Sequence, residues 1–272
     1  MKRITLKRFH SEPRRKRDGW KAWLALILIL ICVAGIIYLA NLPEYQIKNI
    51  SIEGAIFTKE SEVISITQYE ISKKYLLLIP ASHIWLYPKQ AIERKIKSAF
   101  SSVTDVSFDV SKKTSNLAIK LTERKQEFIW CQVPMEGDTQ KQCFYMDKTG
   151  FIFATSPDFE GNAFITFFGE MSNEPLGKNF LPKEQMNNLI SFLENLRGLE
   201  LLPASVAVVS LYDVKITLRG GAILIVALDK PLAEASKNLV IILNSPDFEK
   251  ASGGIDKLEY LDLRYGTKAF WK

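Results

Sequence analysis

The fold of this chain is decided by two stretches, residues 47–63, IKNISIEGAIFTKESEV, and residues 91–130, AIERKIKSAFSSVTDVSFDVSKKTSNLAIKLTERKQEFIW. In the first stretch Ile50 and Ile52 alternate with polar residues, which predicts a half-buried strand, and Gly54 permits the turn that follows. The second stretch predicts two more strands from two alternating runs: Val106, Phe108 and Val110, then Leu117, Ile119 and Leu121.

Two helices are predicted between the first strand and the second. Thr58 is placed to cap a helix whose first turn carries two glutamates, because a hydroxyl and negative charge suit a helix N-terminus. Pro88 starts the next helix, whose apolar face holds Ala91, Ile92, Ile96, Ala99 and Phe100. The order strand, helix, helix, strand, strand predicts a small α+β unit over residues 43–124.

Upstream of this unit the charge is unevenly distributed. Residues 1–22 hold nine Lys/Arg and two acids, a net charge of +7, so the rest of a chain of net charge +6 carries −1. Residues 23–42 have no formal charge, and twenty helical residues span about 30 Å, the hydrocarbon thickness of a bilayer. We therefore predict a basic cytoplasmic tail over residues 1–22 and a transmembrane helix over residues 23–42.

The same pattern sets the topology and disfavours two alternatives. Positive charge on one side only puts the tail in the cytoplasm and residues from about 43 onward outside. A cleaved signal peptide would have a shorter apolar region and a small-residue cleavage site, for which residues 38–40, Tyr-Leu-Ala, are a poor match. A nucleic-acid-binding domain would spread basic residues over a folded face, which a nearly neutral body does not do.

Downstream, residues 125–272 are predicted to mix strands with two amphipathic helices. Apolar runs at 128–131 and 143–146 flank a polar loop, which predicts a hairpin, and a second turn follows at Tyr145, Asp147 and Gly150. The polar loop contains Pro134, Gly137 and Asp138.

The remaining pattern gives a helix, a three-stranded meander and a second helix. The first helix is opened by Pro182 and is predicted to bury Met186, Leu189, Ile190, Leu193 and Leu196 before Gly198 closes it. The meander strands are predicted at about 205–212, 214–219 and 222–228. The second helix is opened by Pro231 and is predicted to bury Leu232, Ala235, Leu239, Val240 and Leu243.

The three cysteines are too few for a disulfide-rich scaffold, and the two histidines, His10 and His83, exclude a multi-histidine metal site. Cys131 and Cys143 lie on opposite arms of the predicted hairpin, in a compartment where disulfides persist. They form a disulfide if they face each other and are two buried thiols otherwise. Both possibilities stay open, because a one-residue slip in strand register turns a side chain to the other face.

Three parts of the chain resemble known families. Residues 47–130, with LTER at 121–124 and Trp130 after it, resemble a POTRA domain, a polypeptide-transport-associated module. Residues 260–265, YLDLRY, and residues 145–153, YMDKTGFIF, are similar to the DLRY ending and the D-x-x-G strand pair of the bacterial FtsQ/DivIB cell-division family. The order of tail, span, module and β domain is similar too, whereas the long apolar connection from Tyr75 to Tyr87 departs from the family.

The resemblance implies an α+β fold with a single N-terminal transmembrane helix, a POTRA-like β-α-α-β-β domain over residues 43–124 and a mixed β domain with flanking helices over residues 125–272. It also implies a non-catalytic scaffold of the cytoplasmic (inner) membrane at the division septum, which recruits or restrains septal wall-synthesis proteins. The implied partners are the small bitopic coiled-coil subunits FtsB and FtsL, or DivIC, with no cofactor and no nucleic acid.

Two other functions compete with this one. A membrane-anchored transport or sensor module could use the POTRA-like unit for another client, and the DLRY ending is the feature that speaks against it. An anchored wall-modifying enzyme is disfavoured, because the chain has no G-x-S-x-G or S-x-x-K nucleophile motif and His83 stands among apolar residues without a positioned nucleophile.

The expected partner-binding site is the last strand region. Residues 258–271 follow a helix with no later strand to cover them, which predicts a sheet edge with free backbone groups. Leu261 and Leu263, alternating with Asp262 and Arg264, are expected to face the core. The resemblance implies that the tyrosine of DLRY and the strand after it contact the partner, through Arg264, Tyr265, Gly266, Thr267, Lys268, Ala269, Phe270 and Trp271. The competing interpretation is that Phe270 and Trp271 cover this protein's own core.

Overall fold

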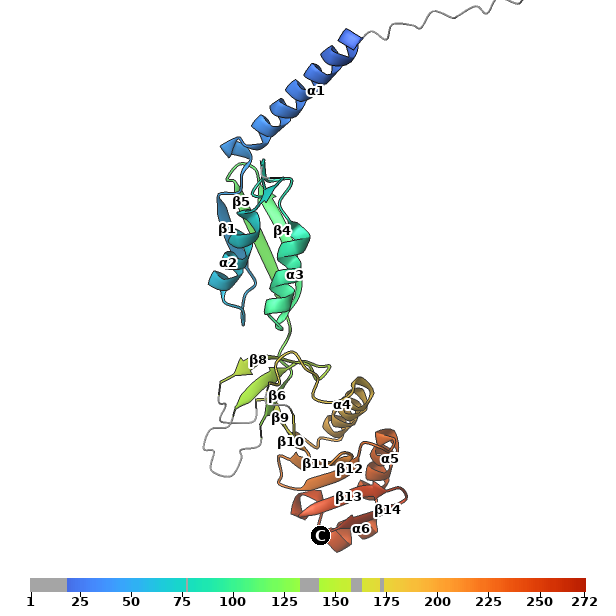
Figure 1. Ribbon diagram of the computed structural model, residues 1–272. Helices are drawn as coiled ribbons and strands as arrows, with labels where there is room; N and C mark the ends of the chain where they lie inside the picture. Colours follow the sequence, from blue (N-terminus) through green and yellow to red (C-terminus); the bar gives the residue numbers. More distant parts are fainter. Residues whose placement is uncertain (1–18, 77, 133–141, 158–162, 172–173) are drawn as a thin grey trace, which may run out of the picture.

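The computed structural model describes residues 19–76, 78–132, 142–157, 163–171 and 174–272 and is a mixed α+β fold (Figure 1). An N-terminal helix leads into a small unit built on a three-stranded sheet, and a larger unit built on a nine-stranded sheet follows. Most of the predicted basic tail, and the predicted loop with Pro134, Gly137 and Asp138, lie outside the described residues.

Helix α1 (Gly19–Ala40) is long and apolar enough to cross a membrane. It ends two residues before the predicted boundary at Leu42. The side-chain amide of Asn41 donates to the carbonyl of Ile37 at 2.8 Å and closes the last turn. Pro43 then begins the short 3-10 helix η1 (Pro43–Tyr45), and a residue before proline is driven away from the helical conformation.

The small unit has the predicted order of strands and helices. Its elements are β1 (Asn49–Glu53), α2 (Glu60–Ile71), α3 (Lys89–Ala99), β4 (Val103–Ser111) and β5 (Asn116–Glu123). The sheet order is β1-β5-β4, with β1 parallel to β5, so the first strand pairs with the last. A hairpin of two short strands, β2 (Lys74–Tyr75) and β3 (Ile79–Pro80), each of two residues, lies within the apolar connection. The core between helices and sheet includes the fully buried Val63, Ile92, Ile96, Leu117 and Ile119.

The predicted helix cap at Thr58 is wrong, because tertiary contacts take up this residue. The N-cap residue of α2 is Lys59. The hydroxyl of Thr58 shares a hydrogen bond of 2.9 Å with the hydroxyl of Ser102, and its backbone N–H donates to the carboxylate of Glu123. Thr58 therefore ties the start of α2 to the ends of β4 and β5 instead of capping the helix.

The large unit is a mixed sheet of order β14-β13-β12-β11-β10-β9-β6-β7-β8. Parallel pairs join β9 to β6, β10 to β9 and β13 to β12, and the other neighbours are antiparallel. The strands are β6 (Phe128–Cys131), β7 (Cys143–Met146), β8 (Ile152–Ser156), β9 (Ile165–Phe168), β10 (Pro203–Val208), β11 (Asp213–Leu218), β12 (Ile223–Ala227), β13 (Tyr260–Tyr265) and β14 (Lys268–Trp271).

Helices α4 (Lys183–Gly198), α5 (Leu232–Leu243) and α6 (Pro246–Ser252), with η2 (Ile255–Lys257), complete the large unit. Their apolar faces pack with alternating strand residues into one core. All five predicted core positions of α4 are buried, as is Phe192. Val240 of α5 was predicted inward but is exposed, because it lies about 100° around the helix from Leu239 and off the stripe of Leu232, Ala235 and Leu239.

The first contact between the units lies where the LTER stretch leaves β5. The carboxylate of Glu123 accepts the backbone N–H groups of Ile56, Phe57 and Thr58 at 2.7–2.9 Å. This holds the ring of Phe57 against Tyr145 and Phe153 of the large unit, with ring centroids 5.3 Å apart in both pairs. We call the Glu123–Phe57 arrangement and the ion pair described next the joint.

The second contact of the joint is the ion pair of Arg124 and Asp147, whose nitrogen and oxygen lie 2.6 Å apart. The other oxygen of Asp147 accepts from the backbone and hydroxyl of Thr149 and the backbone of Phe151, which closes the turn before β8. Gly150 in this turn has φ +84°, and a Cβ there would lie 2.9 Å from the buried Met186 side chain. The D-x-x-G pattern thus builds a tight turn that anchors the neighbouring unit.

Candidate partner-binding edge

The terminal segment forms one edge of the nine-stranded sheet, but only its second half is at that edge. Residues 260–265 form β13, which pairs with β12 on one side and β14 on the other. The expectation that the whole segment 258–271 lies uncovered is therefore wrong, because the chain turns at Gly266 and pairs back on itself. In the described chain β14 is the outer strand.

The register of this hairpin determines which backbone groups face outward. Lys272 and Tyr260 exchange two backbone hydrogen bonds, at 3.1 and 3.2 Å. Residues opposite one another in an antiparallel pair alternate between hydrogen-bonded and non-hydrogen-bonded positions. Trp271, opposite Leu261, is therefore in a non-hydrogen-bonded pair. The N–H and C=O groups of Trp271 and Ala269 point away from β13, where another strand could pair with them.

Exposed aromatic rings flank this edge. Tyr265 is 53% exposed and Phe270 is 52% exposed. Their rings meet edge to face, with centroids 5.3 Å apart. Phe270 lies opposite Asp262 on the sheet face away from Leu261, and Leu261 belongs to the helix-covered core. The pair therefore presents aromatic area beside the open backbone groups, which is the residue type that dominates interface energies.

Trp271 belongs partly to this protein's own packing. Its ring meets Phe248 of α6 edge to face at 5.4 Å, yet it remains 43% exposed. Trp271 shares the core-facing side of β14 with Ala269, which packs against the main core. The competing interpretation thus describes one face of Trp271, whereas Phe270 lies on the other face of the strand.

Arg264 serves an internal role that its position in the sequence did not reveal. Its guanidinium binds Asp262 through Nε and Nη2, the latter at 2.7 Å, and Asp213 of β11 through Nη1 at 3.0 Å. These bonds raise the pKa of Arg264, and the Arg264 contact lowers the pKa of Asp213. Asp262 was expected to face outward but is buried, because the arginine neutralises it.

The turn between β13 and β14 is held by Asn238 of α5 and by Lys230, which precedes that helix. Lys230 Nζ donates to the carbonyl of Arg264 at 2.6 Å, and the side-chain amide of Asn238 donates to the carbonyl of Gly266 at 2.7 Å. Gly266 has φ +62°, the left-handed conformation that glycine adopts without strain. Thr267 and Lys268 are exposed beside it. The edge is therefore fixed in place before any partner arrives, through residues that nothing in the sequence marked out.

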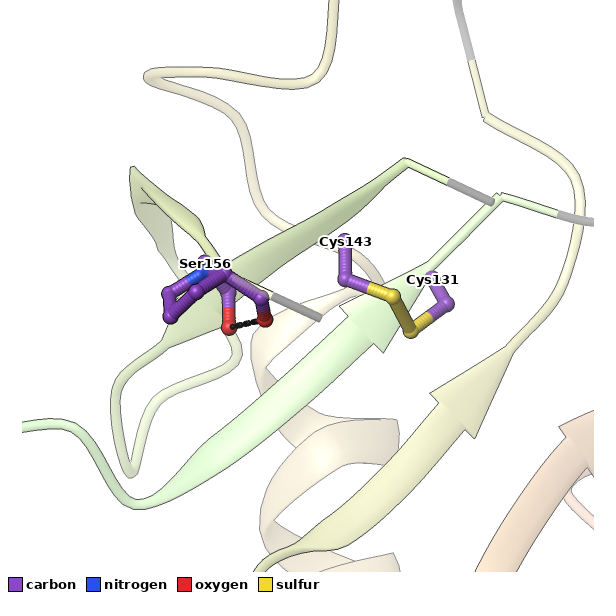
Figure 2. Close-up of a disulfide and its surroundings, with 4 residues drawn as sticks. Cys131, Cys143 and Ser156 are labelled. Atoms are coloured by element: carbon purple, nitrogen blue, oxygen red, sulfur yellow. Dashed lines mark hydrogen bonds between the residues drawn. A yellow bond between two sulfur atoms is a disulfide. The ribbon is translucent and has the colours of Figure 1, made fainter. Parts of the chain in front are cut away.

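Near the opposite edge of the sheet, whose outer strand is β8, Cys131 and Cys143 form a disulfide across β6 and β7, next to Ser156 of β8 (Figure 2). The two residues are register partners and both are buried. They pack with Ile129, Tyr145 and Phe153 in the small core that also receives Phe57. The disulfide thus closes the hairpin on which the joint is built.

We expect thiol counting to detect one reactive thiol in the unfolded, unreduced chain, that of Cys32 in α1. Reduction before unfolding should raise the count to three and lower stability, by about 3 kcal/mol in the loop-entropy model. The double variant Cys131→Ser, Cys143→Ser is the control and should give one thiol under both conditions. Three thiols without reductant would contradict the bridge.

His83 lies beside the aromatic rings of Tyr45 and Trp85. His83 is buried, and burial lowers its pKa; its Nδ1 faces the backbone N–H of Trp85 at 3.4 Å. Among the described residues, no group of three or more His, Cys, Asp and Glu side chains could hold a metal ion. Comparison with protein-family models gives no match for this chain, and neither does comparison with curated proteins.

Proposed function

We propose that this chain is a non-catalytic, single-span membrane scaffold of the FtsQ/DivIB kind, which binds small bitopic coiled-coil proteins of the bacterial division machinery. The observation that carries the proposal is the β14 edge. It combines outward backbone groups at Ala269 and Trp271 with the exposed Tyr265–Phe270 pair, on a turn fixed by Lys230 and Asn238.

The arrangement of the small unit supports the further proposal that this unit is a POTRA domain. Its strand and helix order is β-α-α-β-β if the β2–β3 hairpin is set aside, and its first strand pairs in parallel with its last. LTER supplies both contacts of the joint, through Glu123 and Arg124. We propose that this unit spaces the β14 edge from the membrane, because α1 and the large unit attach to its opposite ends (Figure 1).

The proposed mode of binding is strand addition. An extended segment of the partner pairs with the outward groups of Ala269 and Trp271, while its alternate side chains pack on Tyr265 and Phe270. Backbone pairing supplies affinity with little sequence demand, and the aromatic pair selects an apolar side chain. Recruitment or restraint of wall synthesis then follows from what the bound partner contacts.

The experiment that tests the proposal is capture of a small division coiled-coil subunit by the full chain in lipid vesicles. We expect a stable complex with an FtsB-, FtsL- or DivIC-type subunit. An unrelated bitopic coiled coil of similar length should be left behind. If the chain is folded and inserted but retains no FtsB-, FtsL- or DivIC-type subunit, the transport or sensor alternative becomes the better explanation.

We expect the chain to be oriented with its N-terminus in the cytoplasm. A reporter active only outside the cytoplasm should work when fused after Lys272 and fail when fused after Lys16, because the nine basic residues within positions 1–22 stay on the cytoplasmic side. A cytoplasm-specific reporter at the same two positions is the control and should give the opposite result. Activity after Lys16 outside the cytoplasm would overturn the orientation.

A further inference from the structure

The small unit carries an exposed apolar surface in the connection between α2 and α3. It consists of Tyr75, Leu76, Leu78, Trp85 and Leu86, all exposed, with Leu76 at 90%. We call these five residues the hairpin patch. Such a concentration on one short connection is unusual for a surface that faces only water. It is also the stretch in which the sequence departs from the family that it otherwise resembles.

The hairpin patch is built on a fixed base. The N–H of Ala81 donates to the carbonyl of Lys73 at 2.8 Å, and the hydroxyl of Tyr75 donates to the carbonyl of Leu86 at 3.0 Å. Lys73 is itself held by Glu70 at 2.6 Å. Leu76 has φ +48°, a left-handed conformation that costs a residue with a Cβ roughly 1–2 kcal/mol. The fold thus bears a conformational cost while holding a leucine out into its surroundings.

Three contacts place the hairpin patch beside the end of α1. Ala40, the last helical residue, is buried where α1 meets β3. The side-chain amide of Asn41 donates to the carbonyl of Leu78 at 3.0 Å. Trp85 stacks on Tyr45, with ring centroids 5.5 Å apart. Ile47, only seven positions after Ala40, is already in the core of the small unit, so the linker leaves little room for movement.

The polar residues around the patch suit a lipid headgroup layer. Lys73 and Lys74 precede Tyr75, and the ammonium of Lys112 lies 5.2 Å from the centre of the Trp85 ring. Tryptophan and tyrosine concentrate at the membrane interface, where an apolar ring body and a polar edge are both satisfied. Lysine side chains can keep their charge among phosphates while their stems cover apolar surface.

We propose that the hairpin patch inserts into the outer surface of the bilayer that α1 crosses, so that the small unit is docked on the membrane and not merely tethered to it. The proposal rests on the proposed membrane anchoring by α1. We choose lipid as the occupant because the contacts of Asn41 and Tyr45 hold the patch beside the end of α1. In every copy of the chain the patch therefore lies next to the bilayer that α1 crosses. Docking of this kind limits the directions in which the β14 edge is presented.

The test uses the full chain, carrying Cys32→Ser, in vesicles of phosphatidylcholine and phosphatidylglycerol. A cysteine at Leu76 (Leu76→Cys) is labelled without reductant with an environment-sensitive NBD fluorophore, and peptide mass spectrometry verifies that only this position is labelled. Leu78→Cys is a second test position. Leu211→Cys is the matched control, because Leu211 is an exposed leucine between β10 and β11 of the large unit.

At positions 76 and 78 we expect blue-shifted emission, quenching by a nitroxide-labelled lipid, and protection from aqueous iodide. Position 211 should show the reverse of all three. Emission at 76 and 78 that matches position 211 would overturn the proposal. Because the vesicles contain only this protein and lipid, that outcome would leave a protein partner as the occupant of the patch. Flotation and alkaline extraction of the same vesicles test α1 separately: a chain that floats and resists extraction is anchored, whatever the label at position 76 reports.

Discussion

Replacing Tyr265 with alanine is expected to weaken binding of the small coiled-coil partner by about 2 kcal/mol or more, roughly 30-fold in Kd, while the large unit stays folded. Tyr265 is half exposed and packs edge to face on Phe270, which is equally exposed. Removing its ring therefore takes area from the interface and little from the core. Titration of the full chain in vesicles with the purified partner, together with the melting temperature of each variant, measures both effects.

Two variants make this test selective. Tyr69→Ala removes an exposed tyrosine from α2 of the small unit and should leave Kd unchanged. The double variant Tyr265→Ala, Phe270→Ala removes the whole aromatic pair and should bind still more weakly. Unchanged affinity of that double variant, with an unaltered melting temperature, would exclude the β14 edge as the docking site. A collapsed melting temperature would instead place the pair in this protein's own core. Trp271 is a poorer probe, since its contact with Phe248 adds a stability effect.

Local patterns predicted the elements well where an apolar run is bounded by turn residues. Strands β6 and β7 have the predicted bounds, because each is a short apolar run with turn residues beyond it. The bounds of α1 were shifted because one side-chain bond from Asn41 ends the helix early, which hydropathy does not register. The order of the large sheet was not predictable, because its three parallel pairs join strands that are far apart in sequence.

The sequence predicted which segment holds the candidate site, but only in part which of its side chains are buried or exposed. Periodicity placed Leu261 and Leu263 inward, and the structure buries both. Asp262 is also buried, since Arg264 binds it and reaches Asp213, which lies 51 positions away in sequence. A single sequence has no signal for that pairing. The same limit applies to the hairpin patch, whose leucines have the composition of a core segment and are exposed only because the base of the hairpin turns them outward.

Replacing Glu123 with alanine is expected to have the largest effect on the joint between the two units. The variant leaves three backbone N–H groups, those of Ile56, Phe57 and Thr58, without their carboxylate acceptor. Hydrogen bonds to charged groups contribute about 1.5–3 kcal/mol each, and Ile56 is exposed enough for water to replace its bond. The two bonds to Phe57 and Thr58, at the lower figure, give an expected loss of about 3 kcal/mol in local stability, which hydrogen exchange should report as at least roughly 100-fold faster exchange of these two amides.

Two further variants test whether the effect depends on both carboxylate oxygens of Glu123 or only on the loss of a negative charge in this region. Glu123→Gln keeps the shape but supplies one acceptor oxygen where the structure uses both, Oε2 for Ile56 and Phe57 and Oε1 for Thr58, so it should not restore slow exchange. Glu127→Ala removes an acid that forms only a surface pair with Lys125, and it should change stability by no more than about 0.5 kcal/mol. Wild-type exchange in Glu123→Gln would contradict the two-oxygen clamp.

If the clamp holds, its loss also frees the Phe57 ring from Tyr145 and Phe153, and the angle between the units should then vary more in the alanine variant. The Arg124–Asp147 ion pair and the Arg124 guanidinium, which lies 4.1 Å from the centre of the Phe151 ring, would then remain as links between the units.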